Sequence, residues 1–467
     1  MATNGKAREQ LTALPIEPVY SQIAPNEPIQ LGTHLVEFAF DGKTYTAPAA
    51  ITMRFVPKDQ LTFVVFGNAV PDSLIWRLAL GQSDRCGKLK LIDRNIVVDV
   101  ASVPAGGERG GIAFWPLQSG FEAREPTDSI VQATFHLFNF PEFRGPDDFV
   151  FLHGQLPLEG ATLCDRVTLK ASGWIVTIAG SERTNKLTNA LRAEGGFVIT
   201  HVGRIEREDG SEFSSEDLIK LETCLCYFLS FALGRWVGIN LVVGRNASGT
   251  CVYEKWGMRR TAEGRWNASI SWFDSLTGKL LAEVFPGFFN LWNSTHWDPA
   301  LAHSLYWYIA ASEGGTGRGI DTGIILAQTA LELLAWTYCV KDHKILSARD
   351  FKPGGLSASE KFRRFLTSIR IPLAIPTEMK ALHSKPDKKW TDSMHAITGV
   401  RNSLIHPDAQ HDLPHHSFYD AWRLSLWYLD LILLRLCGHN GEYSNRLTRR
   451  SQGQLELVPW IHNCNTP

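Results

Sequence analysis

Residues 400–407, with the sequence Val-Arg-Asn-Ser-Leu-Ile-His-Pro, bring three chemically capable side chains into one short stretch. Cleavage of a phosphodiester needs a group that titrates near neutral pH to move protons, and a fixed cation to stabilise the developing negative charge. His406 and Arg401 are of these two types. Asn402, four residues before His406, lies on nearly the same face of a helix and is placed to orient the imidazole. This stretch is therefore the first candidate for a catalytic site.

The spacing of Arg401 and His406 determines how they can cooperate. On an ideal helix, residues five apart are separated by about 140° around the axis, so the two side chains do not converge. Pro407 disfavours the helical conformation at His406, which predicts that the helix ends there. The partial negative charge of a helix C-terminus favours imidazolium. We therefore expect His406 at or beyond a helix end, and a second copy of the motif across a dimer interface.

A structural interpretation competes with the catalytic one. An arginine on a helix is usually solvated or ion-paired, and a histidine before a proline often only ends a helix. Short motifs also match by chance. Taken alone, the six residues from Arg401 to His406 favour this structural interpretation, so the elements that position them have to be considered.

Apolar periodicity typical of helices begins near residue 299 and continues to about 439. Asp321 and Thr391 are the expected N-caps of two of these helices. The predicted helices cover residues 300–311, 320–341, 358–369, 391–405 and 417–437. This pattern predicts a bundle of four to five helices, with the motif near the end of the fourth.

The N-terminal half is rich in strand signals. Asp41-Gly42 separates two alternating runs, 34–40 and 43–46, which is a strong hairpin signal. Ser214 is the expected N-cap of a helix that runs to about residue 233. Further strands are predicted at residues 51–55, 61–66, 96–100, 111–115, 130–138, 149–152, 165–171, 174–179, 237–243 and 251–256. The spacing of the strands up to residue 179 predicts an antiparallel sandwich or barrel-like region over roughly residues 30–205, and the last two strands fall in a mixed segment.

A chain of 467 residues is too long for a single core, which predicts an α+β multidomain fold. The expected division is an extended lead-in at 1–28, a β-rich domain at 29–205, a mixed α/β continuation or bridge at 206–295, a helical bundle at 296–440, and a C-terminal tail at 441–467. Pro459-Trp460 in the tail is expected to dock back on the body.

Composition is typical of a soluble, folded protein, with 44% hydrophobic and 20% charged residues. The net charge of -1 excludes a global polyanion-binding signature, although residues 299–467 carry 19 Lys and Arg against 15 Asp and Glu. The eight cysteines have no CxxC or zinc spacing and are expected to be reduced core thiols. The N-terminus has no apolar signal-peptide region, and the apolar window 224–243 is interrupted by Gly234-Arg235 and Asn240. We therefore expect a cytoplasmic protein without a membrane span.

The motif resembles one found in a known superfamily. Arg401-Asn402-x-x-x-His406 is similar to the R-x(4–6)-H motif of HEPN proteins in its frequent RNxxxH form, and it precedes the last long helix, as in that family. Residues 330–334, Ala-Leu-Glu-Leu-Leu, resemble an acidic-apolar segment of the same family. The similarity covers about residues 300–440. The length, the β-rich N-terminal half and Val458-Pro459-Trp460 are similar to the ApeA-type HEPN proteins of bacterial anti-phage defence.

This resemblance implies a metal-independent endoribonuclease that needs no cofactor and acts on RNA as a homodimer or higher homo-oligomer. Arg401 would stabilise the phosphorane-like charge, His406 would move protons to or from the 2′-hydroxyl and the leaving oxygen, and Asn402 would position His406. Glu332 is a supporting candidate, although it is as well explained as a solvated charge. In abortive infection, the N-terminal region would sense a phage-derived or small-molecule trigger. Many HEPN proteins lack activity, so a non-catalytic dimerisation or ligand-binding module is the alternative.

Other polar groups have weaker claims. A third hypothesis, a β-domain that binds carbohydrate or peptide and carries a helical appendage, is supported by no specific residue. The segment 314–319 lacks the lysine of a phosphate-binding loop and is expected to be a flexible connector. A segment rich in acidic residues and histidines begins at the end of the motif. It has no recognised metal-ligand spacing and is expected to be a solvated loop. Its potential ligands are His406, Asp408, His411, Asp412, His415 and His416. The candidate RNA-phosphate contacts are Lys361, Arg363 and Arg364, with Arg446, Arg449 and Arg450.

Overall fold

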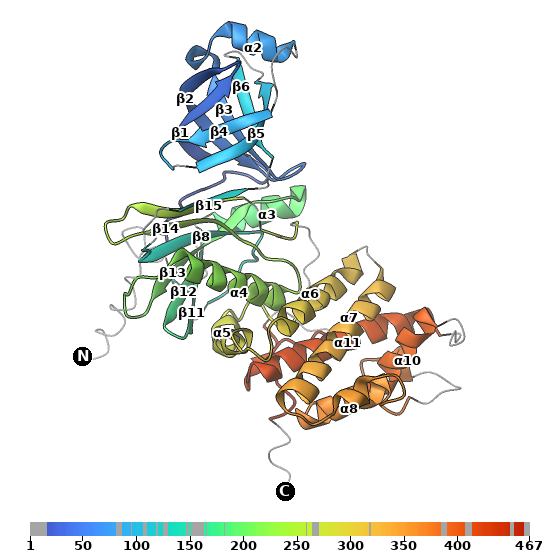
Figure 1. Cartoon of the computed structure of the whole chain (residues 1–467). Helices are drawn as coiled ribbons and strands as arrows, with labels where there is room; N and C mark the ends of the chain where they lie inside the picture. Colours follow the sequence, from blue (N-terminus) through green and yellow to red (C-terminus); the bar gives the residue numbers. More distant parts are fainter. Residues whose placement is uncertain are drawn as a thin grey trace, which may run out of the picture.

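The structure is a computed structural model, and it describes residues 16–80, 86–94, 96–105, 110–117, 120–124, 129–145, 149–150, 163–164, 166–181, 183–257, 259–263, 270–316, 319–383, 390–406, 413–448 and 453–461. These residues form a closed barrel, a larger sheet and a helical bundle, in that order along the chain (Figure 1). The expected α+β multidomain class is confirmed.

The barrel closes through the antiparallel order β1-β2-β3-β6-β5-β4. Its strands are β1 (Ile29–Phe40), β2 (Lys43–Arg54), β3 (Gln60–Phe66), β4 (Cys86–Leu91), β5 (Ile96–Pro104) and β6 (Gly111–Pro116). Phe40 pairs with Lys43, and Asp41 and Gly42 both have positive φ, 49° and 72°, as a two-residue type I′ turn requires. The predicted hairpin is confirmed. The run 51–55, expected as a separate strand, mostly continues β2.

A short 3-10 helix η1 (Gly67–Ala69) and the helix α2 (Asp72–Ala79) follow β3, and α2 packs on β5. Inward-facing residues such as Phe38, Phe63 and Phe114 fill the barrel. Its core continues into one face of the larger sheet through Phe138 and Trp256. The barrel and the sheet therefore share a core.

The larger sheet has seven antiparallel strands in the order β11-β12-β13-β8-β14-β15-β7. They are β7 (Phe121–Arg124), β8 (Gln132–Phe138), β11 (Arg166–Ala171), β12 (Trp174–Gly180), β13 (Ile199–Arg207), β14 (Ile239–Arg245) and β15 (Cys251–Trp256). A separate pair is formed by β9 (Phe149–Val150) and β10 (Leu163–Cys164). Because β14 and β15 complete the sheet between β8 and β7, the segment 206–295 continues the β-rich region.

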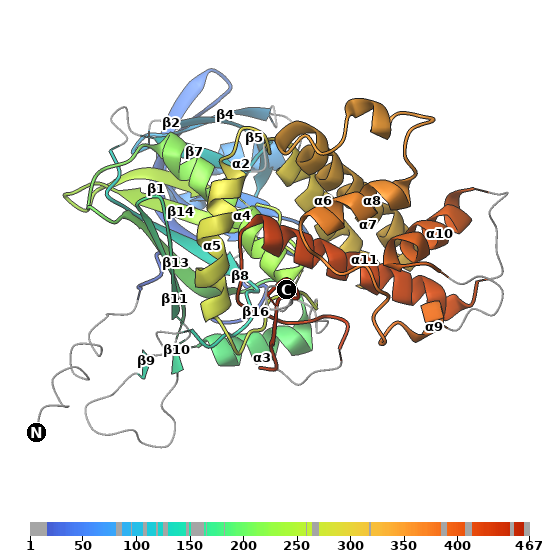
Figure 2. The same cartoon turned by 90° about the horizontal axis from the view of Figure 1, so that it is seen from below.

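Three helices accompany this sheet: α3 (Thr184–Glu194), α4 (Ser215–Leu233) and α5 (Lys279–Trp292). Ser214 caps α4 as expected, because its Oγ accepts the backbone N–H of Asp217 at 3.2 Å. Helices α4 and α5 lie between the sheet and the bundle in both views (Figures 1 and 2). One continuous core therefore joins the second face of the sheet to the bundle.

The bundle contains α6 (Ala300–Ser312), η2 (Glu313–Thr316), α7 (Ile320–Trp336), the π-helical turn η3 (Thr337–Asp342), η4 (Ala348–Phe351), α8 (Ala358–Ser368), α9 (Lys380–His383), α10 (Ser393–Ile405) and α11 (His415–Leu436). Two expected N-caps are wrong: Gly319 precedes α7, with Asp321 in its first turn, and Asp392 rather than Thr391 caps α10. Helix α11 also starts earlier than expected.

Within the described residues, one helical stretch, Ile320–Asp342, is long and apolar enough to cross a membrane. It comprises α7 and η3, and 56% of its most apolar window is buried inside the protein. Helix α7 packs against α6, α8, α10 and α11. Burial in the bundle accounts for its apolar character.

The tail docks on the body, as predicted for Trp460. Its indole Nε1 donates to the backbone O of His439 at 3.1 Å, and its side chain is buried. Two short strands, β16 (Glu442–Tyr443) and β17 (Glu456–Leu457), pair in this tail. Arg446, expected as an RNA contact, is instead buried in a bidentate ion pair with Asp430, at 2.6 and 2.9 Å. That expectation is wrong for Arg446, while Arg449 and Arg450 lie outside the described residues.

Candidate functional site

Helix α10 presents the motif, and its start is fixed by polar contacts. The Oδ1 of Asp392 accepts the backbone N–H of His395 at 2.8 Å, and Arg363 Nε donates to Oδ2 of the same carboxylate at 2.6 Å. Two residues before Arg401, the ring of Trp390 lies so close to Gly399 that a Cβ there would be 2.4 Å from a ring carbon. A larger residue at position 399 would therefore force the Trp390 ring to move.

The end of α10 follows the expectation drawn from Pro407. The last helical residue is Ile405, and His406 has extended backbone angles, φ -113° and ψ 113°. Its backbone N–H donates to the carbonyl oxygen of Asn402 at 3.0 Å, and its side chain is exposed. The prediction that His406 lies at a helix end is confirmed.

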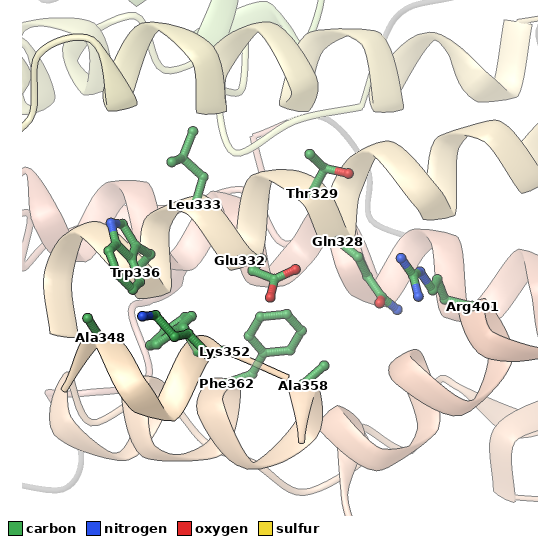
Figure 3. A pocket seen from close by; sticks show the side chains of 11 residues that line it. Gln328, Thr329, Glu332, Leu333, Trp336, Ala348, Lys352, Ala358, Phe362 and Arg401 are labelled. Atoms are coloured by element: carbon green, nitrogen blue, oxygen red, sulfur yellow. The ribbon is translucent and has the colours of Figure 1, made fainter. Parts of the chain in front are cut away.

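A pocket of about 580 Å³ lies between α7, α8 and the η4 region, and Arg401 lines one end of it (Figure 3). Pockets of this size accommodate small organic ligands. Helix α7 forms one wall through side chains spaced about a turn apart. The lining residues are Gln328, Thr329, Glu332, Leu333, Trp336, Ala348, Phe351, Lys352, Ala358, Phe362 and Arg401.

Arg401 has hydrogen-bonding capacity to spare. Its Nη1 donates to the side-chain oxygen of Asn402 at 3.3 Å, while its Nε is buried and has no hydrogen-bond partner among the described residues. A buried donor without a partner is unfavourable unless a ligand or water meets it. The guanidinium group is therefore suited to bind an anion at this end of the pocket.

Glu332 lies in the same pocket but already has a cationic partner. Its Oε1 accepts from Lys361 Nζ at 3.3 Å, and that ammonium also lies 4.8 Å from the ring centre of Phe351. The side chain of Lys361 is 9% exposed and that of Glu332 is 52% exposed. Glu332 is therefore the counterion of a mostly buried lysine, and Lys361 is poorly placed to contact a phosphate in solvent.

The pocket does not include the other two motif residues. Asn402 and His406 are exposed and are not among its lining residues. The amide of Asn402 accepts from Arg401, and its contact with His406 runs through the backbone. The structure thus brings Arg401 and Glu332 together, and it shows no contact by which the Asn402 amide would orient the imidazole.

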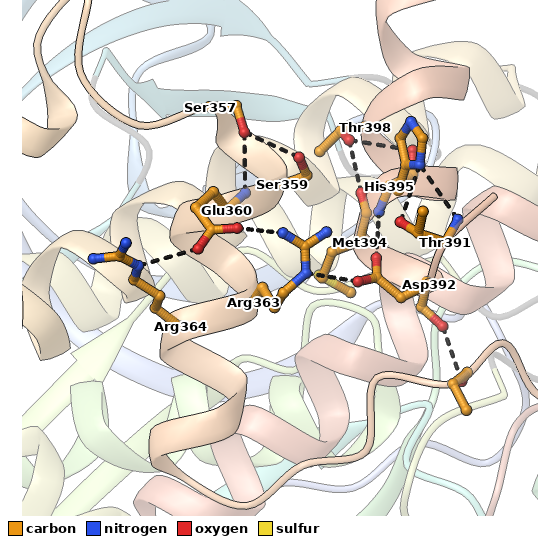
Figure 4. A network of polar contacts seen from close by, with 12 residues as sticks. Ser357, Ser359, Glu360, Arg363, Arg364, Thr391, Asp392, Met394, His395 and Thr398 are labelled. Carbon is orange, nitrogen blue, oxygen red and sulfur yellow. Dashed lines mark hydrogen bonds and ion pairs between the residues drawn. The ribbon is translucent and has the colours of Figure 1, made fainter.

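Arg363 and Arg364, expected as RNA contacts, are bound to carboxylates (Figure 4). Arg364 Nε donates to Glu360 at 3.1 Å, and Arg363 bridges Glu360 and Asp392. Hydrogen bonds from Arg364 and Arg363 hold the pKa of Glu360 below its usual value. Both arginines are therefore largely neutralised, and Arg363 ties α8 to the start of α10.

The histidine-rich segment divides between helix and loop. His415 and His416 belong to the first turn of α11, so the expectation of a loop is wrong for them. Asp408, His411 and Asp412 lie outside the described residues. Where the structure describes the chain, no group of three or more His, Cys, Asp and Glu side chains is arranged to hold a metal ion. Of the glycine-rich segment, 317–318 also lies outside the described residues.

Sequence reasoning missed most of the lining residues, among them four that matter for ligand binding: Gln328, Trp336, Phe351 and Lys352. Gln328 offered a signal, because it interrupts the buried apolar stripe that includes Ile324 and Leu331 in α7. Its Nε2 donates to the backbone O of Ile397 in α10 at 2.7 Å. The other three are brought together by packing of η4 against α7, which periodicity does not reveal.

Comparison with known proteins covers both the sheet and the bundle. Residues 125–267 match the family model of the YopA central domain, and residues 294–456 match that of the YopA C-terminal domain. The chain resembles YopA. Over 452 residues it is 26% identical to the SPbeta prophage-derived uncharacterized protein YopA of Bacillus subtilis (strain 168), which covers 93% of this chain and 95% of that protein. No solved structure matches the chain.

Proposed function

We propose that the protein is a metal-independent, HEPN-type endoribonuclease of the cytoplasm that works as a homodimer. The observation that carries this proposal is the guanidinium of Arg401 beside a ligand-sized pocket, its buried Nε unpaired among the described residues, with an exposed histidine ending the same helix. Arg401 stabilises negative charge on the phosphorus oxygens. His406 moves protons between the 2′-hydroxyl and the leaving oxygen.

A second protein copy completes the site in this proposal. Within one chain, Arg401 lines the pocket and His406 does not. Symmetric pairing of two chains around the ends of their α10 helices would place two exposed imidazoles near two arginines. The similarity to a prophage-derived protein supports a role in conflict between phage and host, with the barrel and sheet sensing the trigger.

The decisive experiment incubates the purified full chain with single-stranded and structured RNA in EDTA. Arg401→Ala and His406→Ala should each abolish cleavage. Arg349→Ala, an exposed arginine near the pocket, and His303→Ala, an exposed histidine on α6, serve as matched controls and should cleave like the wild type. Cleavage that survives both motif substitutions, or that requires added metal, would contradict the proposal.

A specific observation favours a second candidate, a non-catalytic HEPN module that binds a ligand. His406 lies outside the pocket, and the expected RNA contacts Lys361, Arg363 and Arg364 are all paired with carboxylates. This candidate predicts ligand binding that depends on Arg401 but not on His406, and no RNA cleavage by the wild type.

A further inference from the structure

The two ends of the pocket differ in chemistry. Trp336 and Phe351 lie at one end, with ring centres 5.0 Å apart in an edge-to-face arrangement. Arg401 lies at the other end, with Gln328 and Glu332 between them (Figure 3). Aromatic side chains bind flat heterocycles by stacking, and a guanidinium group binds phosphate. The arrangement suits a ligand that is aromatic at one end and anionic at the other.

Charge supports the same conclusion. Three cations surround the pocket: Arg401 and Lys352 line it, and Lys361 lies behind Glu332. Glu332 is the carboxylate among the lining residues. The four groups together carry an excess of positive charge. A wholly apolar ligand would leave the buried Nε of Arg401 without a partner, and an inorganic anion alone would leave the aromatic end unused.

The middle of the pocket offers hydrogen-bond acceptors. The amide of Gln328 is oriented by donation from its Nε2 to Ile397, which leaves its oxygen as an acceptor. The carboxylate of Glu332 is half exposed and supplies further acceptor positions. Exocyclic amines of nucleobases are donors that match such acceptors.

We propose that this pocket holds one unpaired nucleotide, with its base against Trp336 and Phe351 and a phosphate against Arg401. The size of about 580 Å³ suits a single nucleotide rather than a duplex. That the nucleotide belongs to the RNA substrate rests on the proposed ribonuclease function. A base held here would place the adjoining phosphate at the motif, so the pocket would select cleavage sites in single strands.

The test uses the full chain in EDTA and a single-stranded DNA hexamer, which lacks the 2′-hydroxyl and cannot be cleaved by this chemistry. Calorimetry measures its dissociation constant beside those of the four 5′-mononucleotides, inorganic phosphate and a duplex of equal length. Trp336→Ala should weaken binding of the hexamer about ten-fold or more, and Phe351→Leu should weaken it several-fold. Trp336→Phe should restore most of the affinity. Trp76→Ala, an exposed tryptophan on α2, is the matched control and should bind like the wild type.

Each outcome decides the proposal. Equal affinity of the wild type and both aromatic variants overturns it, as does phosphate that binds as tightly as the mononucleotides, or duplex that binds as tightly as the hexamer. Mononucleotides that bind while the hexamer does not would assign the pocket to a free nucleotide and overturn its link to RNA. If Trp336→Ala does not fold, the affinities of Phe351→Leu and Lys352→Ala for the hexamer test the proposal instead.

The two proposals fail separately. Trp336-dependent binding without any RNA cleavage by the wild type would remove the ribonuclease function and keep the nucleotide pocket. Cleavage that needs His406, with a site preference unchanged by Trp336→Ala or Phe351→Leu, would keep the ribonuclease and remove the pocket.

Discussion

Arg401 and Glu332 line one pocket from two different helices, α10 and α7, although they lie far apart in the chain. The hydrogen bond from Gln328 Nε2 to the backbone O of Ile397 joins the same two helices at 2.7 Å. Gln328 and Glu332 lie one turn apart on the same face of α7. The packing of α7 against α10 therefore sets the position of Arg401 relative to Glu332. The order of the site therefore depends on the contact between α7 and α10.

Glu332 is expected to serve as the counterion of Lys361 and as an acceptor for the bound base, and to take no part in the chemical step. Glu332→Gln should lower the free energy of unfolding by about 1 kcal/mol, because a mostly buried ammonium loses its carboxylate while the exposed half of the pair is screened by solvent. The double variant Glu332→Gln/Lys361→Met should recover most of that loss in urea unfolding. It should also keep the wild-type kcat for RNA cleavage, because the change at Glu332 affects binding of the base and not the chemical step. A stable but inactive double variant would place Glu332 in the active site instead.

Arg363 is expected to stabilise the fold rather than bind RNA. Arg363→Ala should lower the free energy of unfolding by about 1 kcal/mol, since it removes the ion pair with Asp392, the residue that caps α10. Arg364→Ala is the matched control, and because Arg364 is more exposed its effect should stay within about 0.5 kcal/mol. Urea unfolding and RNA affinity are measured on the same preparations. If Arg363→Ala had normal stability but bound RNA more weakly, Arg363 would be an RNA contact, as the sequence predicted.

Acid should loosen the N-terminal segment through His136. Its Nδ1 donates to the backbone O of Leu241 at 3.0 Å, and its Nε2 accepts the backbone N–H of Tyr20 at 3.1 Å, so both nitrogens are satisfied only in the neutral ring. Burial lowers the pKa of His136 to about 4. The unfolded chain, with a pKa of about 6.5, then binds more protons than the folded chain, so stability is complete above about pH 6.5 and falls as the pH approaches about 4.

The size of this effect can be measured. Lowering the pH from about 7 to about 5.5 should cost about 1 kcal/mol through His136 alone. His136→Gln should be less stable at neutral pH and should lose that part of the pH dependence in urea unfolding. His201→Gln is a useful comparison, because burial lowers the pKa of His201 to about 3 without any contact to Tyr20. Of the two variants, only His136→Gln should become more susceptible to proteolysis near Tyr20.

The ion pair between Asp430 and Arg446 should be essential to the bundle. Both side chains are buried, and the hydroxyl of Tyr308 donates to Asp430 at 2.7 Å. Asp430→Asn leaves a buried guanidinium without its carboxylate and should cost about 3–5 kcal/mol. Tyr308→Phe removes the hydrogen bonds that the hydroxyl donates to Asp430 and accepts from Arg446 but keeps the ion pair, and it should cost about 1–2 kcal/mol. Denaturant unfolding distinguishes the two, and an Asp430→Asn variant as stable as Tyr308→Phe would contradict this account.

Local signals predicted local structure well. Pro407 predicted the end of α10 because its ring acts on the residue before it, and Asp41-Gly42 predicted a hairpin because both residues tolerate positive φ. The cap of α10 was misplaced by one residue, since Thr391 and Asp392 are both capable caps and the ion pair with Arg363 favours the second.

Long-range arrangement was not predictable in this way. Barrel closure depends on β4 pairing with β1, and neither the strand β4 nor this pairing has a distinctive sequence pattern. The pocket likewise depends on how η4 and α8 pack against α7, so Lys352 and Trp336 had no local mark of a ligand site. Neutralisation of Arg363 by Asp392 required knowing that α8 and α10 are neighbours.

The position of Arg446 and Trp460 along the chain has a consequence for biosynthesis. Both follow every helix of the bundle in sequence, yet Arg446 is the counterion of Asp430 inside α11 and Trp460 covers the end of that helix. A nascent chain that has only just released α11 from the ribosome still carries a buried carboxylate without its partner. The bundle therefore reaches its full stability only after the tail has left the ribosome and docked on α11.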